Sequence, residues 1–175
     1  LFLAWVLRPK VPEIEDFGTN EFDDFERGIL LNKQSNDANV PVIYGERLVG
    51  GTRVFMETSG TDNTYLYMAI VLSEGEINSI EEVRVDDKVV TFASSLSDGT
   101  EVEVGSGDSN FYKDSASLIR IQPFFGTDSQ SASSLLSTLS SWGSNHRLRG
   151  LCYLALRFKW NQDAFTGIPK VQAKI

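Results

Sequence analysis

The chain has 175 residues, with 24 acidic against 16 basic side chains, a formal net charge of −8 and 41% hydrophobic residues. This length suits one domain with its own core, or one domain and a small appendage. The single cysteine, Cys152, excludes an intrachain disulfide, and the single histidine, His146, excludes a metal site built from several imidazoles. The acidic balance argues against a phosphate-binding surface over the whole domain and predicts solubility or basic partners.

The sequence divides into an N-terminal arm, 1–39, and a domain, 40–175. The arm opens with an apolar run, Leu1–Leu7, which is far shorter than a bilayer span. We expect this run to be buried against a neighbouring surface, and the alternative is the end of a longer apolar helix. The first residue is not Met and the last residues stop inside an alternating pattern, so we expect the sequence to be part of a longer polypeptide.

Residues 13–26 of the arm combine seven acids with three phenylalanines, Phe17, Phe22 and Phe25. One interpretation is a solvated acidic loop. The alternative is an extended arm whose phenylalanines dock on another subunit while its carboxylates meet basic side chains. Three phenylalanine rings are costly to leave in water, which keeps the second interpretation open.

From residue 40 onward the patterns are typical of β-strands. Apolar or alternating segments are separated by turn signals, and the expected strands are 40–44, 52–58, 64–72, 83–85, 89–90, 100–104, 117–121, 150–160 and 170–175. Gly50 and Gly51 break the chain before the second of these strands, and Pro123 is expected to end the strand 117–121. The acidic pair Asp86 and Asp87 is expected to form a hairpin turn.

The strand 150–160 is the clearest of these, because its apolar residues alternate over eleven positions. One face carries Cys152 and Leu154, and the other carries Tyr153 and Arg157. We expect one face to meet the core and the other to meet water or a partner, so Tyr153 and Arg157 are candidate interface residues.

One helix is predicted after a cap at Thr127 or Asp128. Its apolar face would hold Leu135, Leu136, Leu139 and Trp142, and its other face is nearly all serine, so the helix depends on burial. Together, the predicted strands and the one short helix indicate a mainly β fold, arranged as a barrel or a sandwich.

No catalytic constellation can be assembled from these residues. His146 lies in a polar connection, and Cys152 is expected to be buried as a small hydrophobe. Two carboxylate pairs would share a strand face at about 6.5–7 Å, which overlaps the separations used by glycosidases; these pairs are Glu74/Glu76 and Glu101/Glu103. Nothing else in the sequence supports a sugar cleft, so we expect no enzyme, no metal and no cofactor.

Three segments are familiar in combination. They are Pro41-Val42-Ile43-Tyr44-Gly45-Glu46-Arg47 with Val49-Gly50-Gly51, an apolar strand followed by Ser73-Glu74-Gly75-Glu76-Ile77 and a short β-unit, and His146-Arg147-Leu148-Arg149-Gly150. Loosely over 40–175, they resemble the central tail-tip or baseplate hub proteins of phages, of the lambda host-specificity J type. The receptor-binding region of that family is not among these residues.

This resemblance implies a structural protein of the virion at the distal end of the phage tail. Such hubs are usually homotrimers that close the tail tube and take part in genome ejection. The implied partners are further copies of the chain, other tail-tip or baseplate proteins, the C-terminus of the tape-measure protein and, transiently, DNA in the lumen. Contact of the full-length chain with a membrane stays open.

Within this interpretation Gly50, Gly51, Glu74 and Gly75 are structural turn residues, and Gly75 is the one expected to need a positive φ. The alternative function is a carbohydrate- or receptor-binding β-module of a tail fibre. Trp142 and Trp160 are the aromatic candidates for it, although both also fit a core position.

Overall fold

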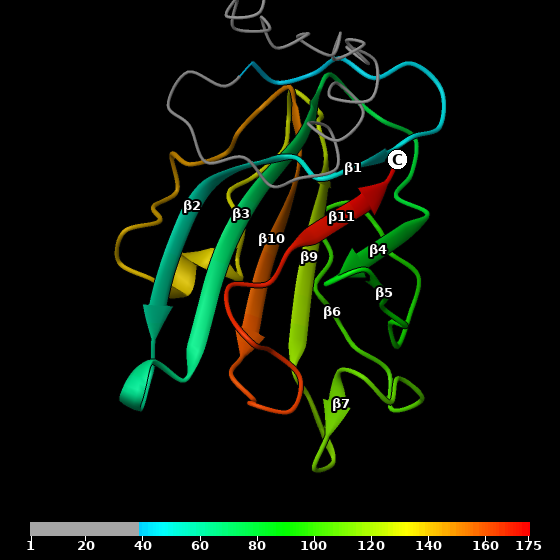
Figure 1. The fold of residues 1–175 in the computed structure, drawn as a ribbon. Helices are drawn as coiled ribbons and strands as arrows, with labels where there is room; N and C mark the ends of the chain where they lie inside the picture. The colour runs from blue at the N-terminus through cyan, green and yellow to red at the C-terminus, as the bar shows by residue number, and fades with distance from the viewer. Residues whose placement is uncertain (1–38) are drawn as a thin grey trace, which may run out of the picture.

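The structure is a computed structural model that describes residues 39–175, and the predicted arm and its phenylalanines lie outside the described residues. The described part is mainly β, as expected, and its helical content is two single 3-10 turns, Thr61–Asn63 and Leu136–Thr138 (Figure 1). Neither turn approaches the length and hydropathy that a membrane-crossing helix needs, and residues 39–175 hold no other helix.

The larger sheet is antiparallel and has five strands in the order β2-β3-β10-β9-β6. Their bounds are Thr52–Ser59 for β2, Tyr65–Glu74 for β3, Leu151–Lys159 for β10, Ile119–Phe125 for β9 and Val102–Glu103 for β6. The two central strands, β3 and β10, are buried along most of their length on both faces. That burial explains why β3 reads as a continuous apolar run rather than an alternating one.

The smaller sheet has four strands in the order β1-β11-β4-β5. Their bounds are Leu48–Val49 for β1, Val171–Lys174 for β11, Glu82–Val85 for β4 and Lys88–Val89 for β5. The predicted hairpin between β4 and β5 is confirmed: Asp86 and Asp87 both have positive φ, as a two-residue hairpin turn requires. A separate hairpin pairs β7 (Tyr112–Lys113) with β8 (Ala116–Ser117).

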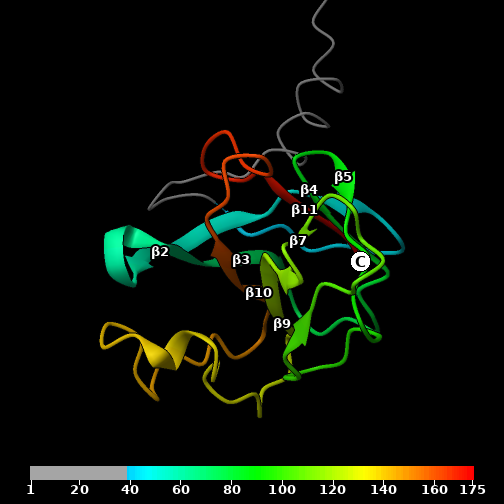
Figure 2. The same cartoon turned by 90° about the horizontal axis from the view of Figure 1, so that it is seen from below.

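The five-stranded sheet is the middle of three layers, because it buries a core on each face. One core joins it to the smaller sheet and includes Met68, Ile70, Leu154, Leu156, Val83, Val85, Val171 and Ala173. The other joins it to the segment 127–149 and includes Ala69, Val71, Tyr153, Ala155, Leu135, Leu136, Leu139 and Trp142. Figure 2 shows that segment and the smaller sheet on opposite sides. Both sheets are open, so the arrangement is sandwich-like and not a barrel.

The predicted helix is wrong beyond one 3-10 turn, although its apolar residues are buried together as expected. Side-chain hydroxyls there bind nearby backbone groups: Ser137 donates to the carbonyl oxygen of Ser133 (2.7 Å) and Thr138 to that of Leu135 (2.9 Å). The Ser133 hydroxyl instead donates to Gln122 of β9 (2.6 Å). Serine-rich segments lose helical backbone to such local bonds, which the apolar spacing does not reveal.

Two strand boundaries also differ from expectation. Pro123 lies inside β9, because its carbonyl oxygen accepts from Gly99 (2.7 Å) on the side away from β10, where no ladder bond needs its missing N–H. The expected strand 40–44 is reduced to one bridge between Val42 and Glu74, and Val42 and Tyr44 are exposed.

Candidate functional site

The three segments that carry the sequence resemblance meet at one end of the five-stranded sheet, where β3 ends (Figure 1, top). The backbone N–H of Glu74 donates to the carbonyl oxygen of Pro41 (2.9 Å), and that of Gly75 donates to Gly150 (2.8 Å). We call residues 41–45, 73–77 and 146–150 at this place the sheet corner. Segments more than a hundred positions apart in the sequence are therefore held together here by backbone hydrogen bonds.

The corner depends on glycine, because its backbones approach closely with positive φ. Gly75 has φ 90°, which confirms its expected conformation, and Gly150 has φ 74°. A Cβ on Gly126 (φ 92°) would lie 2.3 Å from the carbonyl oxygen of Gly75. Sequence reasoning missed Gly126, although a glycine directly after an aromatic strand was a usable signal.

The predicted turn at Gly50 and Gly51 carries the chain from β1 of the smaller sheet to β2 of the larger one. Gly51 has φ 68°, and a Cβ there would lie 2.4 Å from the carbonyl oxygen of Val71. Gly50 is buried and does not have a positive φ. Of the two, Gly51 is the residue that only glycine can occupy without displacing a neighbouring strand.

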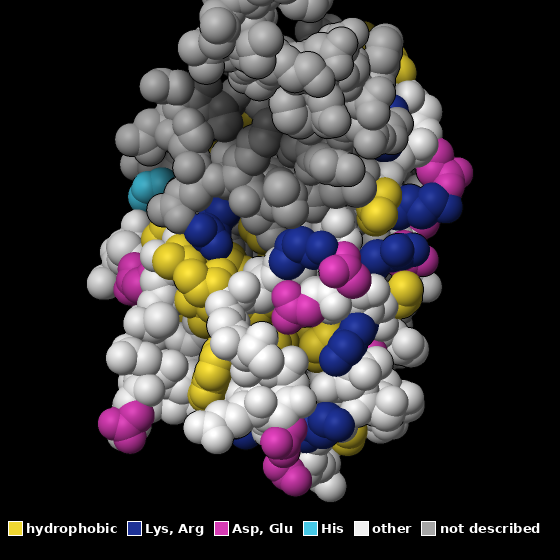
Figure 3. Space-filling view, in the orientation of Figure 1, with side chains coloured by type: hydrophobic (Ala, Val, Ile, Leu, Met, Phe, Trp, Pro, Cys, Tyr) yellow, Lys and Arg dark blue, Asp and Glu magenta, His cyan; other side chains and the backbone are white. Residues whose placement is uncertain are grey.

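Exposed apolar side chains lie at the corner and, separately, on β2. Tyr44 is 92% exposed and Val42 is 55% exposed, while Val54 and Met56 on β2 are 49% and 40% exposed. Figure 3 shows hydrophobic side chains on this face over β2 and β3. We call Val54 and Met56 with the outer edge of β2 the β2 edge.

The β2 edge is long and open. β2 pairs with β3 on one side, and among residues 39–175 no strand pairs with its other side. The register shifts between Arg53 and Phe55, so Val54 sits in a bulge. Met56 lies opposite Met68, which belongs to the core between the two sheets. No described β2 residue packs into that core, so the smaller sheet does not cover Met56. An open strand of this kind is a template for pairing with another chain.

The structure corrects the interface prediction for Tyr153. Its ring is fully buried, stacked on Phe124 with centroids 4.5 Å apart, because the segment 127–149 covers this face of the sheet. Burial also raises the pKa of Tyr153 well above its ordinary value of 10. Arg157 is half-buried, with its guanidinium 5.1 Å from the ring centroid of Tyr65, and its interface role stays a prediction.

The residues with chemical potential occupy structural positions. Cys152 is buried as expected, and that burial raises the pKa of its thiol to about 12. Glu101 and Glu103 both form ion pairs with Arg120, which lies between them. No group of three or more metal-ligating side chains converges within residues 39–175.

Trp142 and Trp160 differ as candidates for sugar stacking. Trp142 is 5% exposed and packs edge-on against Phe55 (centroids 5.0 Å apart) and beside His146 (5.1 Å), so neither of its faces is open. Trp160 is 46% exposed and tilts toward Phe165.

Sequence comparison supports a class, the structural proteins of phage tails and baseplates, and with it a place in the virion. The chain is 23% identical to the baseplate hub protein pb3 of Escherichia phage T5, in an alignment that covers 78% of this chain and 18% of that protein. No model of a known protein family matches the chain.

Among solved structures, the fold is similar to a chain in the virion of a native gene transfer agent particle, with a TM-score of 0.53 and 18% identity. That match covers 85% of this chain and 29% of the other, and it shows a shared fold. The chain therefore spans less than a third of the length of either relative.

Proposed function

We propose that this chain is a structural module of a phage tail-tip hub of the J type, at the distal end of the tail. The observation that carries the proposal is the sequence similarity to the baseplate hub protein pb3, which extends over most of this chain. In this role the module works by contacts between chains and makes or breaks no covalent bond.

The fold supports a contact between copies at the β2 edge. β2 is an eight-residue strand, and an open edge of that length with exposed Val54 and Met56 favours aggregation in a protein that stays alone. A second copy that pairs with this edge would satisfy its backbone groups and bury both side chains. Repeated around an axis, such contacts would close a ring, which we propose is the trimer that seals the tail tube and opens for DNA.

The sheet corner supports the same role in a different way. Its segments are joined by backbone hydrogen bonds, and Gly45, Gly75 and Gly150 in it have positive φ. Tyr44, almost fully exposed beside it, offers an aromatic ring to a neighbouring protein. We propose that other baseplate proteins or the tape-measure C-terminus contact the hub here.

The test is the self-association of the full chain, measured by sedimentation velocity over a hundredfold range of concentration. We expect the chain to associate reversibly and the double variant Val54→Lys/Met56→Lys to sediment as a monomer, because paired lysines block edge pairing. Val89→Lys is the matched control, since Val89 is equally exposed (48%) on β5. A chain that is monomeric throughout, or a double variant that assembles like the parent, would refute the β2 contact.

A further inference from the structure

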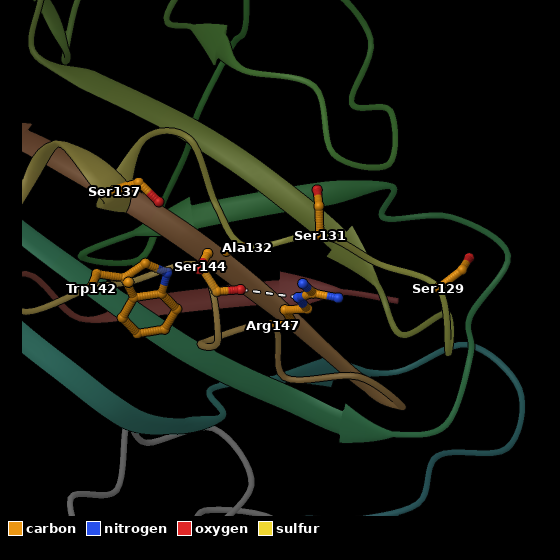
Figure 4. A pocket seen from close by; sticks show the side chains of 8 residues that line it. Ser129, Ser131, Ala132, Ser137, Trp142, Ser144 and Arg147 are labelled. Carbon is orange, nitrogen blue, oxygen red and sulfur yellow. Dashed lines mark hydrogen bonds between the residues drawn. The ribbon is translucent and has the colours of Figure 1, made fainter.

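The segment 127–149 forms a hollow of about 600 Å³ (Figure 4). The segment lies on the side of the large sheet opposite the smaller sheet (Figure 2). Among residues 39–175 the lining of the hollow is rich in serine and holds no carboxylate; the residues are Ser129, Ser131, Ala132, Ser137, Trp142, Gly143, Ser144 and Arg147. This volume lies within the range of about 300–1,000 Å³ that is typical of ligand pockets.

Trp142 lines this hollow and carries a donor without a partner. Its side chain is 5% exposed, and its Nε1 is buried without a hydrogen-bond partner. In Figure 4 the indole nitrogen lies on the ring edge turned toward Ser144. An indole N–H only donates, and a buried donor without a partner is costly, so an acceptor from outside the described residues would stabilise it.

Arg147 adds a positive charge to the same hollow. Its Nε donates to the carbonyl oxygen of Ser144 (3.0 Å), which fixes the side chain and leaves the two terminal nitrogens available. Within residues 39–175 no carboxylate forms an ion pair with it.

The hydroxyls of the hollow are also available as donors. Ser137 already donates to Ser133, but the hydroxyls of Ser129, Ser131 and Ser144 form no hydrogen bond with the described residues. A lining of indole N–H, guanidinium and hydroxyl groups without an acid favours a ligand that carries negative oxygen atoms.

We propose that this hollow binds carboxylate side chains of an acidic polypeptide segment. The guanidinium fork of Arg147 matches a carboxylate with two parallel hydrogen bonds. A nucleic acid is disfavoured because its binding needs several cations along a phosphate backbone, whereas this hollow has one and the chain carries a net charge of −8.

The occupant is residues 13–26 of a second copy of the chain. This segment offers seven carboxylates in fourteen positions, so its charge complements the hollow, and its three phenylalanines add apolar area. The binding chemistry is independent of the hub role and of the β2 edge, since the hollow lies on the opposite face of the large sheet from Met56.

The experiment uses the full chain with its seven acids in 13–26 changed to the corresponding amides, so that this segment of another copy does not compete for the hollow. A synthetic peptide of residues 13–26 is titrated into it and heat is measured by calorimetry. We expect saturable binding, and a loss of about tenfold or more when the peptide carries amides in place of its acids. Inorganic phosphate serves as the alternative source of negative oxygen.

Variants locate the binding. Arg147→Ala should weaken the binding of the peptide by about tenfold or more. Trp142→Phe keeps the packing on Phe55 and should weaken the binding of the peptide severalfold. Arg149→Ala is the matched control, because Arg149 is exposed two residues away and does not line the hollow; it should stay within about twofold. Equal binding of the amide peptide, unchanged binding by Arg147→Ala, or tighter binding of phosphate than of the peptide would each overturn the proposal.

Discussion

At the scale of single residues, Gly51 and Gly75 share a backbone conformation but differ in their surroundings. Both have positive φ, yet a Cβ on Gly75 meets nothing within 4 Å, while a Cβ on Gly51 meets the Val71 carbonyl oxygen and the Ile70 side chain. The pair separates the cost of the conformation from the cost of the close approach.

Gly75→Ala should lower the free energy of unfolding by about 1 kcal/mol, the cost of a left-handed backbone with a Cβ. Gly51→Ala should cost more, because the methyl group also has to push β3 away. Urea denaturation of the full chain and both variants measures this difference. Equal losses would show that the 2.4 Å approach at Gly51 relaxes without cost.

Cys152 makes stability depend on alkaline pH. Burial raises the pKa of its thiol from 9.0 to about 12 in the folded chain, so the unfolded chain ionises first as the pH rises. The free energy of unfolding should therefore hold below pH 9 and fall between pH 9 and 12. The raised pKa of the buried Tyr153 acts in the same direction from about pH 10, the ordinary pKa of tyrosine, upward.

Urea denaturation between pH 8 and 11 measures this slope. The Cys152→Ala variant loses packing and should be less stable than the parent at every pH. Its free energy of unfolding should fall less steeply above pH 9, since it has no thiol to ionise. Identical slopes for the two chains would contradict the assignment of the alkaline loss to Cys152.

At the scale of elements, the segment 127–149 is held by buried glutamine rather than by helical structure. The Nε2 of Gln130 donates to the carbonyl oxygens of Arg147 (2.9 Å) and Leu151 (3.2 Å), and its Oε1 accepts from Gly126 (3.2 Å). Gln130 is 5% exposed, so one buried amide joins the start of the segment to its end at Arg147 and to the flanking residues Gly126 and Leu151.

Gln130→Leu should therefore destabilise the fold by about 2–4 kcal/mol, because it leaves several buried backbone groups without partners at about 1–3 kcal/mol each. Ser129→Ala, one residue away and exposed, should change stability by less than about 0.5 kcal/mol. Thermal or urea denaturation checks both. A leucine variant as stable as the parent would mean that water satisfies these groups.

The sequence predicted the strands because alternation and apolar runs report burial directly, as in β2, β3 and β10. It failed on the helix because serine hydroxyls compete for the backbone, and on Pro123 because sequence does not say which side of a strand bonds its neighbour. Glycine positions were partly predictable: the turns at Gly51 and Gly75 were found, whereas the close approach at Gly126 depends on tertiary contact.

The candidate sites were less predictable than the strands. The pattern correctly placed Tyr153 on the opposite strand face from Cys152, but a two-residue period does not reveal what covers a face, and the segment 127–149 covers this one. Trp142 and Arg147 meet in one hollow because an irregular segment folds over the sheet, and no periodicity encodes that.

At the scale of the whole molecule, the open sheets explain why we expect this module to function in an assembly. The five-stranded sheet is covered on both faces, but its β2 edge and the exposed Val42 and Tyr44 beside the corner have no cover among residues 39–175. These surfaces lie on different parts of the module, so one copy could contact a second copy and another baseplate protein at the same time.

The most direct test is a cryo-EM map of the intact particle that resolves the tail tip. The account predicts density for residues 39–175 at the distal end of the tail tube, with a strand of another copy at the β-pairing distance of about 4.8 Å from the β2 edge. Density for this chain on the capsid or on a side fibre, or a β2 edge that faces solvent in the assembled tip, would contradict it.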